Sequence, residues 1–126
     1  MKNLTRLSIS VLLATLVLVF ATKTAIAQDP AKVASQNYKV LFENDRVRVL
    51  EYHSKPGDKA VMHSHPDYFV YDLASGYKVK FTSPDGKTAE TPESKAGTVT
   101  WRGAETHATE NVGTTDARVL IIELKK

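Results

Sequence analysis

From residue 38 onward, apolar and polar residues alternate along short segments that are separated by turn-forming residues. Residues 46–52 show this best, because a period of two is typical of a half-buried β-strand and places Arg46 and Arg48 on its outer face. Residues 44–45 and 83–86 are turn sequences. The pattern predicts about eight or nine strands, over residues 38–43, 46–52, 59–65, 68–73, 77–82, 88–91, 97–101, 106–110 and 117–124.

Many short strands without an amphipathic helix indicate an all-β domain, either a sandwich or a barrel. The domain is predicted over residues 38–126, and the polar residues 28–37 are predicted to be a flexible lead-in. Pro66 lacks an amide hydrogen for a strand ladder and therefore marks a strand end. The chain has no cysteine, so its packed core, with any bound metal, must stabilise it without disulfides.

The first 27 residues are typical of a secretory signal peptide. Lys2 and Arg6 precede an apolar run over residues 7–20, and the small residues at 25 and 27 fit a cleavage site after Ala27. An uncleaved membrane anchor is the alternative, but the run is shorter than the roughly 20 residues that span a bilayer. The sequence therefore predicts a secreted or periplasmic protein with no membrane contact after cleavage.

Removing this leader changes the charge of the chain. The whole chain has 17 basic and 14 acidic residues, and the loss of Lys2, Arg6 and Lys23 leaves 14 basic residues against 14 acidic ones. A net charge of zero gives no indication of a nucleic-acid surface. The remaining domain is near the lower size limit for a sound core, so a homodimer is expected.

Three of the four histidines suggest a metal site. His63 and His65 are two residues apart, and alternate residues of a strand point to the same face. A metal held by this pair needs a third ligand from elsewhere, and His107 is the candidate. We predict one divalent metal ion bound by His63, His65 and His107. The alternative is that the histidines are scaffold residues that bind no metal.

The same residues resemble the two motifs of the cupins. Gly57, the pair His63 and His65, and Gly76 match the first motif, G-x5-H-x-H-x3-E-x6-G, and residues 97–111 resemble a compressed second motif, G-x5-P-x-G-x2-H-x3-N. The chain is similar to small single-domain bacterial cupins of the cupin-2 type. The resemblance implies a double-stranded β-helix, or jelly-roll barrel, in which the two motifs face each other and usually bind one metal.

The chain departs from these motifs at several positions. Phe69 stands where the first motif has its glutamate, so the usual carboxylate ligand is missing. In the second motif Gly103 replaces the proline and Glu105 the second glycine, and one residue is missing between Glu105 and His107. His107 and Asn111 are retained. The resemblance therefore carries over only the three histidines as ligands.

Three neutral imidazoles would leave the charge of the metal uncompensated, which strengthens its Lewis acidity. Nitrogen ligands admit iron, zinc, nickel, copper or cobalt and disfavour magnesium and calcium. Three protein ligands leave coordination positions open for water, substrate or oxygen. Among cupins, the thiol dioxygenases resemble this chain in using three histidines and Fe(II) without a carboxylate.

Other polar and aromatic residues are weaker candidates. Glu105 shares the face of His107 on a regular strand, and Tyr71 is expected to point inward, so both are pocket candidates. Glu105 is otherwise an exposed rim carboxylate, and Tyr71 a core aromatic residue. His53 is expected at the surface and Trp101 in the core. Arg102 either binds a substrate carboxylate or is a solvated residue at a strand end.

Three hypotheses of function remain open. The first is a metalloenzyme, with a dioxygenase-like cleavage of a small organic acid or thiol as the leading reaction, or an isomerase or lyase that uses the metal as a Lewis acid. The second is a non-catalytic periplasmic module that binds a small ligand or a metal. A third, purely structural reading treats the barrel as a dimerisation unit without metal.

Overall fold

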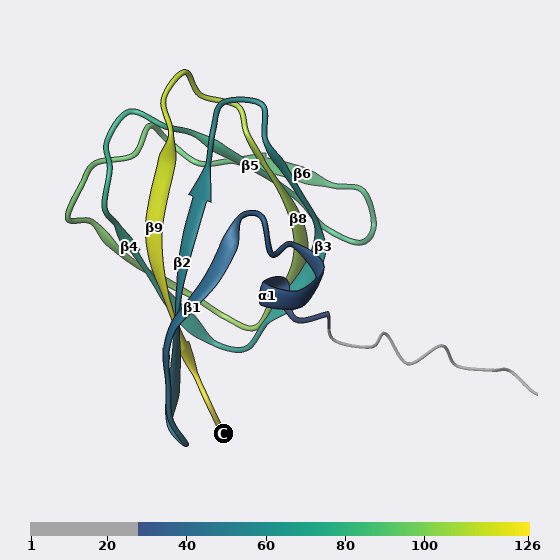
Figure 1. Ribbon diagram of the computed structural model, residues 1–126. Coiled ribbons are helices and arrows are strands. Elements are labelled where there is room, and N and C mark those ends of the chain that lie inside the picture. Colours follow the sequence, from purple (N-terminus) through teal and green to yellow (C-terminus); the bar gives the residue numbers. More distant parts are fainter. Residues whose placement is uncertain (1–27) are drawn as a thin grey trace, which may run out of the picture.

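The computed structural model describes residues 28–126, and the predicted leader lies outside the described residues. Figure 1 shows an open β-barrel with a single short helix against one side. Within the described part of the chain the elements are α1 (Pro30–Val33), β1 (Tyr38–Glu43), β2 (Val47–Ser54), β3 (Lys59–His65), β4 (Tyr68–Asp72), β5 (Val79–Thr82), β6 (Thr88–Glu90), β7 (Val99–Arg102), β8 (Glu105–Asn111) and β9 (Ala117–Leu124).

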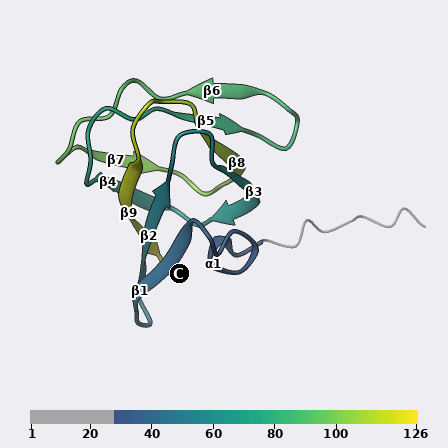
Figure 2. The same cartoon turned by 45° about the horizontal axis from the view of Figure 1, so that its top comes forward.

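The strands form two antiparallel sheets that enclose one interior (Figure 2). The five-stranded sheet has the order β1-β2-β9-β4-β7, and the four-stranded sheet has the order β3-β8-β5-β6. β2 and β9 pair along their whole length, which ties the last strand to the middle of the larger sheet. Strands distant in sequence are therefore neighbours, and groups from both ends of the chain meet in the interior.

The prediction of an all-β domain is confirmed. A strand is present in each of the predicted ranges, and β1, β3 and β9 have the predicted bounds. The period-two burial in β9, where every second residue from Ala117 to Glu123 is buried, is the alternation from which the strands were predicted. Among the described residues, no helix is long and apolar enough to cross a membrane.

The interior is apolar at its centre and polar where β3 and β8 face β9. Leu50 is fully buried beside Tyr52 and Ile121. Replacing such a leucine by alanine costs about 2–5 kcal/mol of stability. Buried polar residues from β3, β8 and β9 occupy the same interior: His63, His65, His107, Thr109, Asn111 and Glu123. Buried polar groups need partners, so this cluster marks the candidate site.

The residues before β1 pack against the barrel. Asp29 caps α1 by accepting a hydrogen bond from the Ala31 amide at 3.0 Å, with Pro30 in the first turn. Ala34 is fully buried, and the Ser64 amide donates to the Gln28 carbonyl at 2.8 Å. The sequence did not predict this helix, because four residues are too few to show a hydrophobic period. The segment places Asp29 beside Arg48 of β2.

Two motif glycines and one proline shape the chain around β3. Gly57 and Gly76 have φ angles of +86° and +91°, in the left-handed region that favours glycine. Pro66 follows β3 directly, as predicted, and the chain then crosses from the four-stranded to the five-stranded sheet. Asp67 accepts a hydrogen bond from the Ala104 amide at 2.8 Å, which ties it to the residue before β8.

Candidate metal centre

The structure brings the three predicted histidines together in the interior. His63 lies directly opposite His107 in the β3–β8 pairing, and His65 is two residues further along the same face. All three are buried, and one nitrogen from each ring lies within 4.8 Å of the other two. The ring centroids are 4.9 Å apart for His63 and His65, 4.9 Å for His63 and His107, and 5.3 Å for His65 and His107.

The tautomer of His63 follows from its partners. Nδ1 lies 2.6 Å from the Val61 carbonyl oxygen, which can only accept, so Nδ1 carries the hydrogen. Nε2 therefore has the lone pair and accepts a hydrogen bond from the Tyr38 hydroxyl at 2.9 Å. Burial raises the pKa of Tyr38 well above its usual 10.0, so the phenol remains a donor. A metal ion at Nε2 would have to replace this hydrogen bond.

His65 is held by a chain of ionic groups that reaches the N-terminal segment. Its Nδ1 lies 2.8 Å from Glu123 Oε1, and the other oxygen of Glu123 accepts from Arg48 Nε at 2.9 Å. Arg48 also donates twice to Asp29, at 3.0 Å each. His65 Nε2 is buried and has no hydrogen-bond partner among the described residues. A carboxylate on one imidazole nitrogen and a free buried lone pair on the other is the usual state of a metal ligand.

His107 has a carboxylate beside it as well. Glu105 Oε1 lies 2.7 Å from His107 Nδ1, a charge contact without the alignment of a hydrogen bond. The same carboxylate accepts from Arg102 at 2.8 and 3.0 Å and from the Tyr68 hydroxyl at 2.6 Å. Glu105 is thus in the site as a partner of a histidine, and it is not part of the cluster of converging ligand atoms.

The charges of these groups suit a cation. Burial, with the two neighbouring histidines, lowers the pKa of His63 to about 4, and burial also lowers that of His107, so both rings are neutral at pH 7. Burial alone would raise the pKa of Glu105 and Glu123. For Glu105 the contact with His107 and the hydrogen bonds from Arg102 outweigh burial, and for Glu123 the hydrogen bonds with His65 and Arg48 do so, which lowers both pKa values and keeps both groups ionised. Neutral imidazoles backed by carboxylates are the protonation states that metal binding requires.

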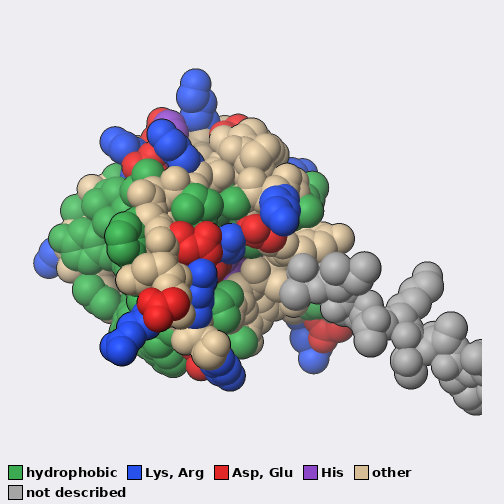
Figure 3. Space-filling view, turned by 60° about the horizontal axis from the view of Figure 1, so that its bottom comes forward, with side chains coloured by type: hydrophobic (Ala, Val, Ile, Leu, Met, Phe, Trp, Pro, Cys, Tyr) green, Lys and Arg blue, Asp and Glu red, His purple; other side chains and the backbone are tan. Residues whose placement is uncertain are grey.

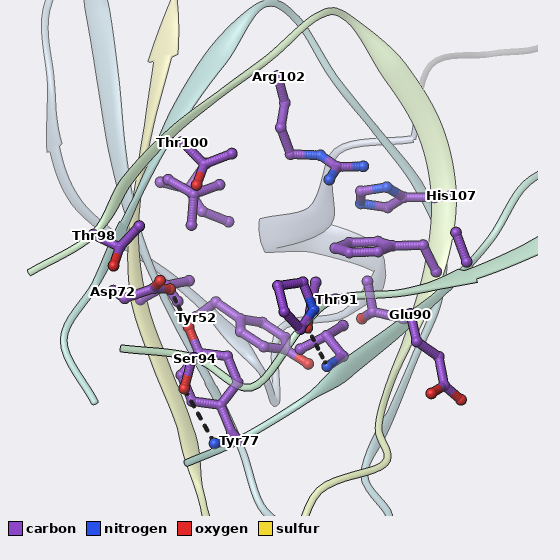
Figure 4. A pocket seen from close by; sticks show the side chains of 18 of the residues that line it. Tyr52, Asp72, Tyr77, Glu90, Thr91, Ser94, Thr98, Thr100, Arg102 and His107 are labelled. Atoms are coloured by element: carbon purple, nitrogen blue, oxygen red, sulfur yellow. Dashed lines mark hydrogen bonds between the residues drawn. The ribbon is translucent and has the colours of Figure 1, made fainter. Parts of the chain in front are cut away.

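A cavity of about 600 Å³ lies beside the histidines, a volume typical of small-molecule sites. His65 and His107 line it, whereas His63 is not part of its wall. Figure 4 shows Arg102 and His107 on one side of this cavity and the hydrogen-bonded pair Asp72 and Tyr77 on the other. A molecule in the cavity would therefore contact the histidine centre at one of its ends.

The predicted side-chain directions of Tyr71 and Trp101 were wrong. Tyr71 and Phe69 are on the outer face of β4, with 37% and 38% of their surface exposed, and neither lines the cavity. Trp101 packs against Phe69 with a centroid distance of 4.8 Å and is 50% exposed. Tyr68 points inward instead. The phase shifts by one residue because the chain changes sheets between His65 and Tyr68, so alternation does not carry across the break.

Other residues have roles that differ from their expected ones. Arg102 is neither a free substrate clamp nor a solvated strand end, because both Glu105 oxygens hold it and its guanidinium lies 4.3 Å from the Phe81 ring centre. His53 is at the surface, as predicted, and pairs with Asp116 at 2.9 Å. The motif residue Asn111 is structural, since its amide donates to the Ser54 and Thr115 carbonyls.

Sequence reasoning missed Tyr38, Arg48 and Glu123. Arg48 was expected on an outer face, but it is largely buried between two carboxylates. Glu123 stands within the apolar run of β9, and a single acid at a position that alternation assigns to the interior is the signal that could have identified it. Tyr38 carried no such signal, because a tyrosine at the start of a strand is also typical of a core.

No protein-family model matches the chain, and no curated protein matches it by sequence. Solved structures do match. A cupin domain from Bordetella pertussis Tohama I is 26% identical, with a TM-score of 0.62, and the match covers 71% of this chain and 92% of that one. An RmlC-like cupin with a double-stranded β-helix fold from Methanocaldococcus jannaschii is 11% identical, with a TM-score of 0.53 and coverage of 70% and 78%.

An oxalate decarboxylase matches at 21% identity with a TM-score of 0.53, over 78% of this chain and 28% of that chain. These likenesses agree with the two antiparallel sheets around one interior. The chain therefore has the cupin fold, a double-stranded β-helix whose interior brings three histidines together.

Proposed function

We propose that this protein is an exported cupin that binds one divalent transition metal ion through His63, His65 and His107 and acts as a dioxygenase-like enzyme on a small organic molecule. The observation that carries the proposal is the convergence of three buried imidazoles within 4.8 Å beside a cavity of about 600 Å³. Buried histidines without a metal would need other partners, and His65 Nε2 has none among the described residues.

The donor set fits a transition metal. Nitrogen ligands favour iron, zinc, nickel, copper or cobalt, and three ligands leave positions open. When bound, such an ion would supply Lewis acidity and, if it is redox-active, electron transfer with oxygen. The oxalate decarboxylase among the structural neighbours is an enzyme on the same fold that acts on a small organic acid.

The residues around the site position and shield it. Glu123 fixes the ring of His65, and the Val61 carbonyl fixes that of His63. Apolar side chains from both sheets form much of the cavity wall and would keep water from a bound molecule. Neither Glu105 nor Glu123 is free to remove a proton, because an arginine holds each of them. At the histidine end of the cavity this favours oxygen-dependent chemistry over an isomerase or lyase reaction that needs a protein base.

A non-catalytic periplasmic module that binds a small ligand or metal is the second candidate. The same absence of an uncommitted acid or base among Glu105 and Glu123 supports it, as does the outward position of Tyr71. The two functions share the metal site and differ in turnover, so separate measurements are needed for each.

Metal content tests the shared site. We expect elemental analysis of the purified protein to find about one transition-metal ion per chain, and we expect His63→Ala and His107→Ala to lose it. His53→Ala is the matched control, because this histidine pairs with Asp116 at the surface and should leave the metal content unchanged. Unchanged metal in His63→Ala would show that the site is assigned wrongly.

Oxygen uptake distinguishes the enzyme from the binding module. The protein would be purified without oxygen, loaded with iron, and screened against small organic acids and thiols with an oxygen electrode. Uptake that needs both the added compound and intact His107 supports the enzyme. Metal binding without uptake supports the binding module.

We also infer a homodimer formed through the outer face of the five-stranded sheet. Five apolar side chains from its five strands lie opposite one another in register, namely Phe42, Val49, Ile122, Phe69 and Trp101. Three of them are more than a third exposed, and Figure 3 shows hydrophobic side chains gathered on the side where β4 and β9 lie in Figure 1. A second copy would cover the same face by two-fold symmetry.

A further inference from the structure

We propose that the cavity binds a compound with one aromatic ring and a cationic or hydrogen-donating end group, that Asp72 holds this end group, and that an anionic group is excluded from the Asp72 end of the cavity. This inference deepens the proposed function, and it rests on that function only in treating the cavity beside the histidines as the ligand site. Ring, end group and charge each follow from different residues of the wall.

Aromatic side chains form part of the wall of the cavity. Four of the five tyrosines of the chain line it, together with Phe81. Tyr52 and Tyr77 belong to the buried core cluster, so their rings are fixed in place rather than free to move. Fixed aromatic rings offer flat apolar surfaces that an aromatic ligand can stack on or meet edge-on. The wall is therefore suited to a planar ring.

Asp72 supplies the recognition of the end group. The Tyr77 hydroxyl donates to Asp72 Oδ1, and Asp72 Oδ2 accepts no side-chain hydrogen bond from any described residue. Burial, followed by this hydrogen bond, raises the pKa of Tyr77, so the phenol stays a donor to the carboxylate. One carboxylate oxygen thus remains available, and it can accept only from a group that carries hydrogen.

The positive charge on the wall is already matched. Arg102 donates to both oxygens of Glu105, at 2.8 and 3.0 Å, and its guanidinium lies over the Phe81 ring. The remaining charged residues of the wall are Asp72 and three exposed residues, Glu90, Glu93 and Lys95, whose charges water screens. With Arg102 neutralised, a ligand carboxylate near Asp72 would therefore meet repulsion without a compensating pair.

The two sides of the cavity differ in charge. Arg102 and His107 form one side, and Asp72 with Tyr77 forms the other (Figure 4). A ligand that crosses the cavity would place its ring among the aromatic side chains, with one end toward the histidines and the other at Asp72. The charge on the end at Asp72 is what the cavity would select.

Three compounds with the same 4-hydroxyphenyl ring differ in the charge of their end group and so test which charge the cavity prefers. Tyramine is cationic at pH 7.4, tyrosol is neutral, and 4-hydroxyphenylacetate is anionic. Titration calorimetry on the full chain after treatment with a chelator should give the affinity order tyramine, tyrosol, 4-hydroxyphenylacetate. We expect about fivefold between the first two, as for a partly exposed ion pair, and a further loss for the anion. Because no metal is present, this result does not depend on the histidine centre.

Two variants test whether the charge of Asp72 sets this preference, and a fall of the ratio in the second would overturn the proposal. Asp72→Asn removes the charge and should reduce the ratio of tyramine to tyrosol affinity to about one. Tyr77→Phe removes the internal donor to Asp72 and keeps its charge, so the ratio should stay or rise. Asp45→Asn is the control, since it makes the same change of charge on an exposed turn far from the cavity wall.

Several results would overturn the proposal: equal affinities for the three compounds, tightest binding of the anion, no binding of any of them, or an unchanged ratio in Asp72→Asn. Thermal unfolding of each variant shows whether it is folded. If Asp72→Asn does not fold, the affinity ratio measured with Tyr77→Phe still tests the proposal. Metal content measured on samples of the same preparations without chelator shows whether the histidine site binds metal, so failure of the ligand proposal can be told from failure of the histidine site.

Discussion

Replacing Glu123 by glutamine is the sharpest test of how the chain supports its histidines. Glu123 lies near the end of β9, and its two oxygens face His65 Nδ1 at 2.8 Å and Arg48 Nε at 2.9 Å. Both partners are donors. Glutamine has nearly the same shape, but only one of its two end atoms can accept, so one donor would face an amide NH₂ group.

The size of the effect follows from these contacts. If the amide turns toward His65, the ring loses the acceptor that fixes its tautomer, and loss of such an outer partner lowers metal affinity about 10–100-fold. This corresponds to about 1.4–2.7 kcal/mol of binding free energy. If the amide turns toward Arg48, the charged partner of His65 is still lost. Asp29 still holds Arg48 through two bonds of 3.0 Å, so we expect the fold to survive.

Competition with a coloured chelator at constant pH measures the metal affinity of each protein. Glu51→Gln is the matched control, because this glutamate pairs with Arg118 at 3.4 Å on the outer face of the same sheet. We expect the control to keep the wild-type affinity. If folded Glu123→Gln bound the metal within twofold of wild type, the assigned role of this carboxylate would be refuted.

Three further predictions concern other parts of the molecule. Tyr38→Phe removes the hydroxyl that competes for His63 Nε2, so metal affinity should rise about fivefold, the value of one hydrogen bond, and a fall would contradict this reasoning. Folding lowers the pKa of His63 from 6.5 to about 4, so the unfolded chain binds this proton more readily than the folded one. The metal-free protein should therefore keep the full contribution of His63 to its stability above pH 6.5 and lose that contribution as the pH falls toward 4. Urea unfolding across this range would show the loss, and a flat profile would count against it. Trp101→Ser should convert a dimer into a monomer in light scattering, whereas a dimer that persists would place the interface elsewhere.

The sequence was sufficient for the strands because their period of two is a local property. β9 illustrates this, since its burial alternates without interruption from Ala117 to Leu124. It also placed the histidines correctly relative to one another. His63 and His65 share a face of one strand, and the spacing of the second motif brings His107 directly opposite His63.

The phase of β4 could not be predicted, because it depends on a change of sheet. His65 ends a strand of the four-stranded sheet and Tyr68 begins a strand of the five-stranded one, and both point inward although they are three residues apart. Tyr71 was expected inward because it lies two residues from Phe69, which holds the position of the motif's glutamate, but both side chains point outward. Trp101 was expected in the core by comparison with the cupin pattern, but it pairs with the outward-facing Phe69.

The partners of the histidines were missed for another reason. Glu123 and Arg48 lie 58 and 17 residues from His65, and nothing local in the sequence connects them. They meet because β2 and β9 pair in full register and place Arg48 opposite Glu123. An arginine that looks outward by alternation is then covered by Asp29 from the N-terminal segment. Only the assembled barrel shows that this arginine has two anionic partners.

These carboxylates change the electronic character expected of the site. Three imidazoles without a glutamate ligand imply an uncompensated cation, but Glu105 and Glu123 each contact the outer nitrogen of one ligand. A carboxylate beside an imidazole makes the ring a stronger donor, so part of the missing negative charge reaches the metal through His65 and His107. Arg102 pairs with Glu105 and Arg48 with Glu123, which limits how much negative charge each carboxylate passes to its histidine. The barrel thus keeps coordination positions open. The negative charge that a direct glutamate ligand would have provided comes instead from carboxylates that contact the histidines.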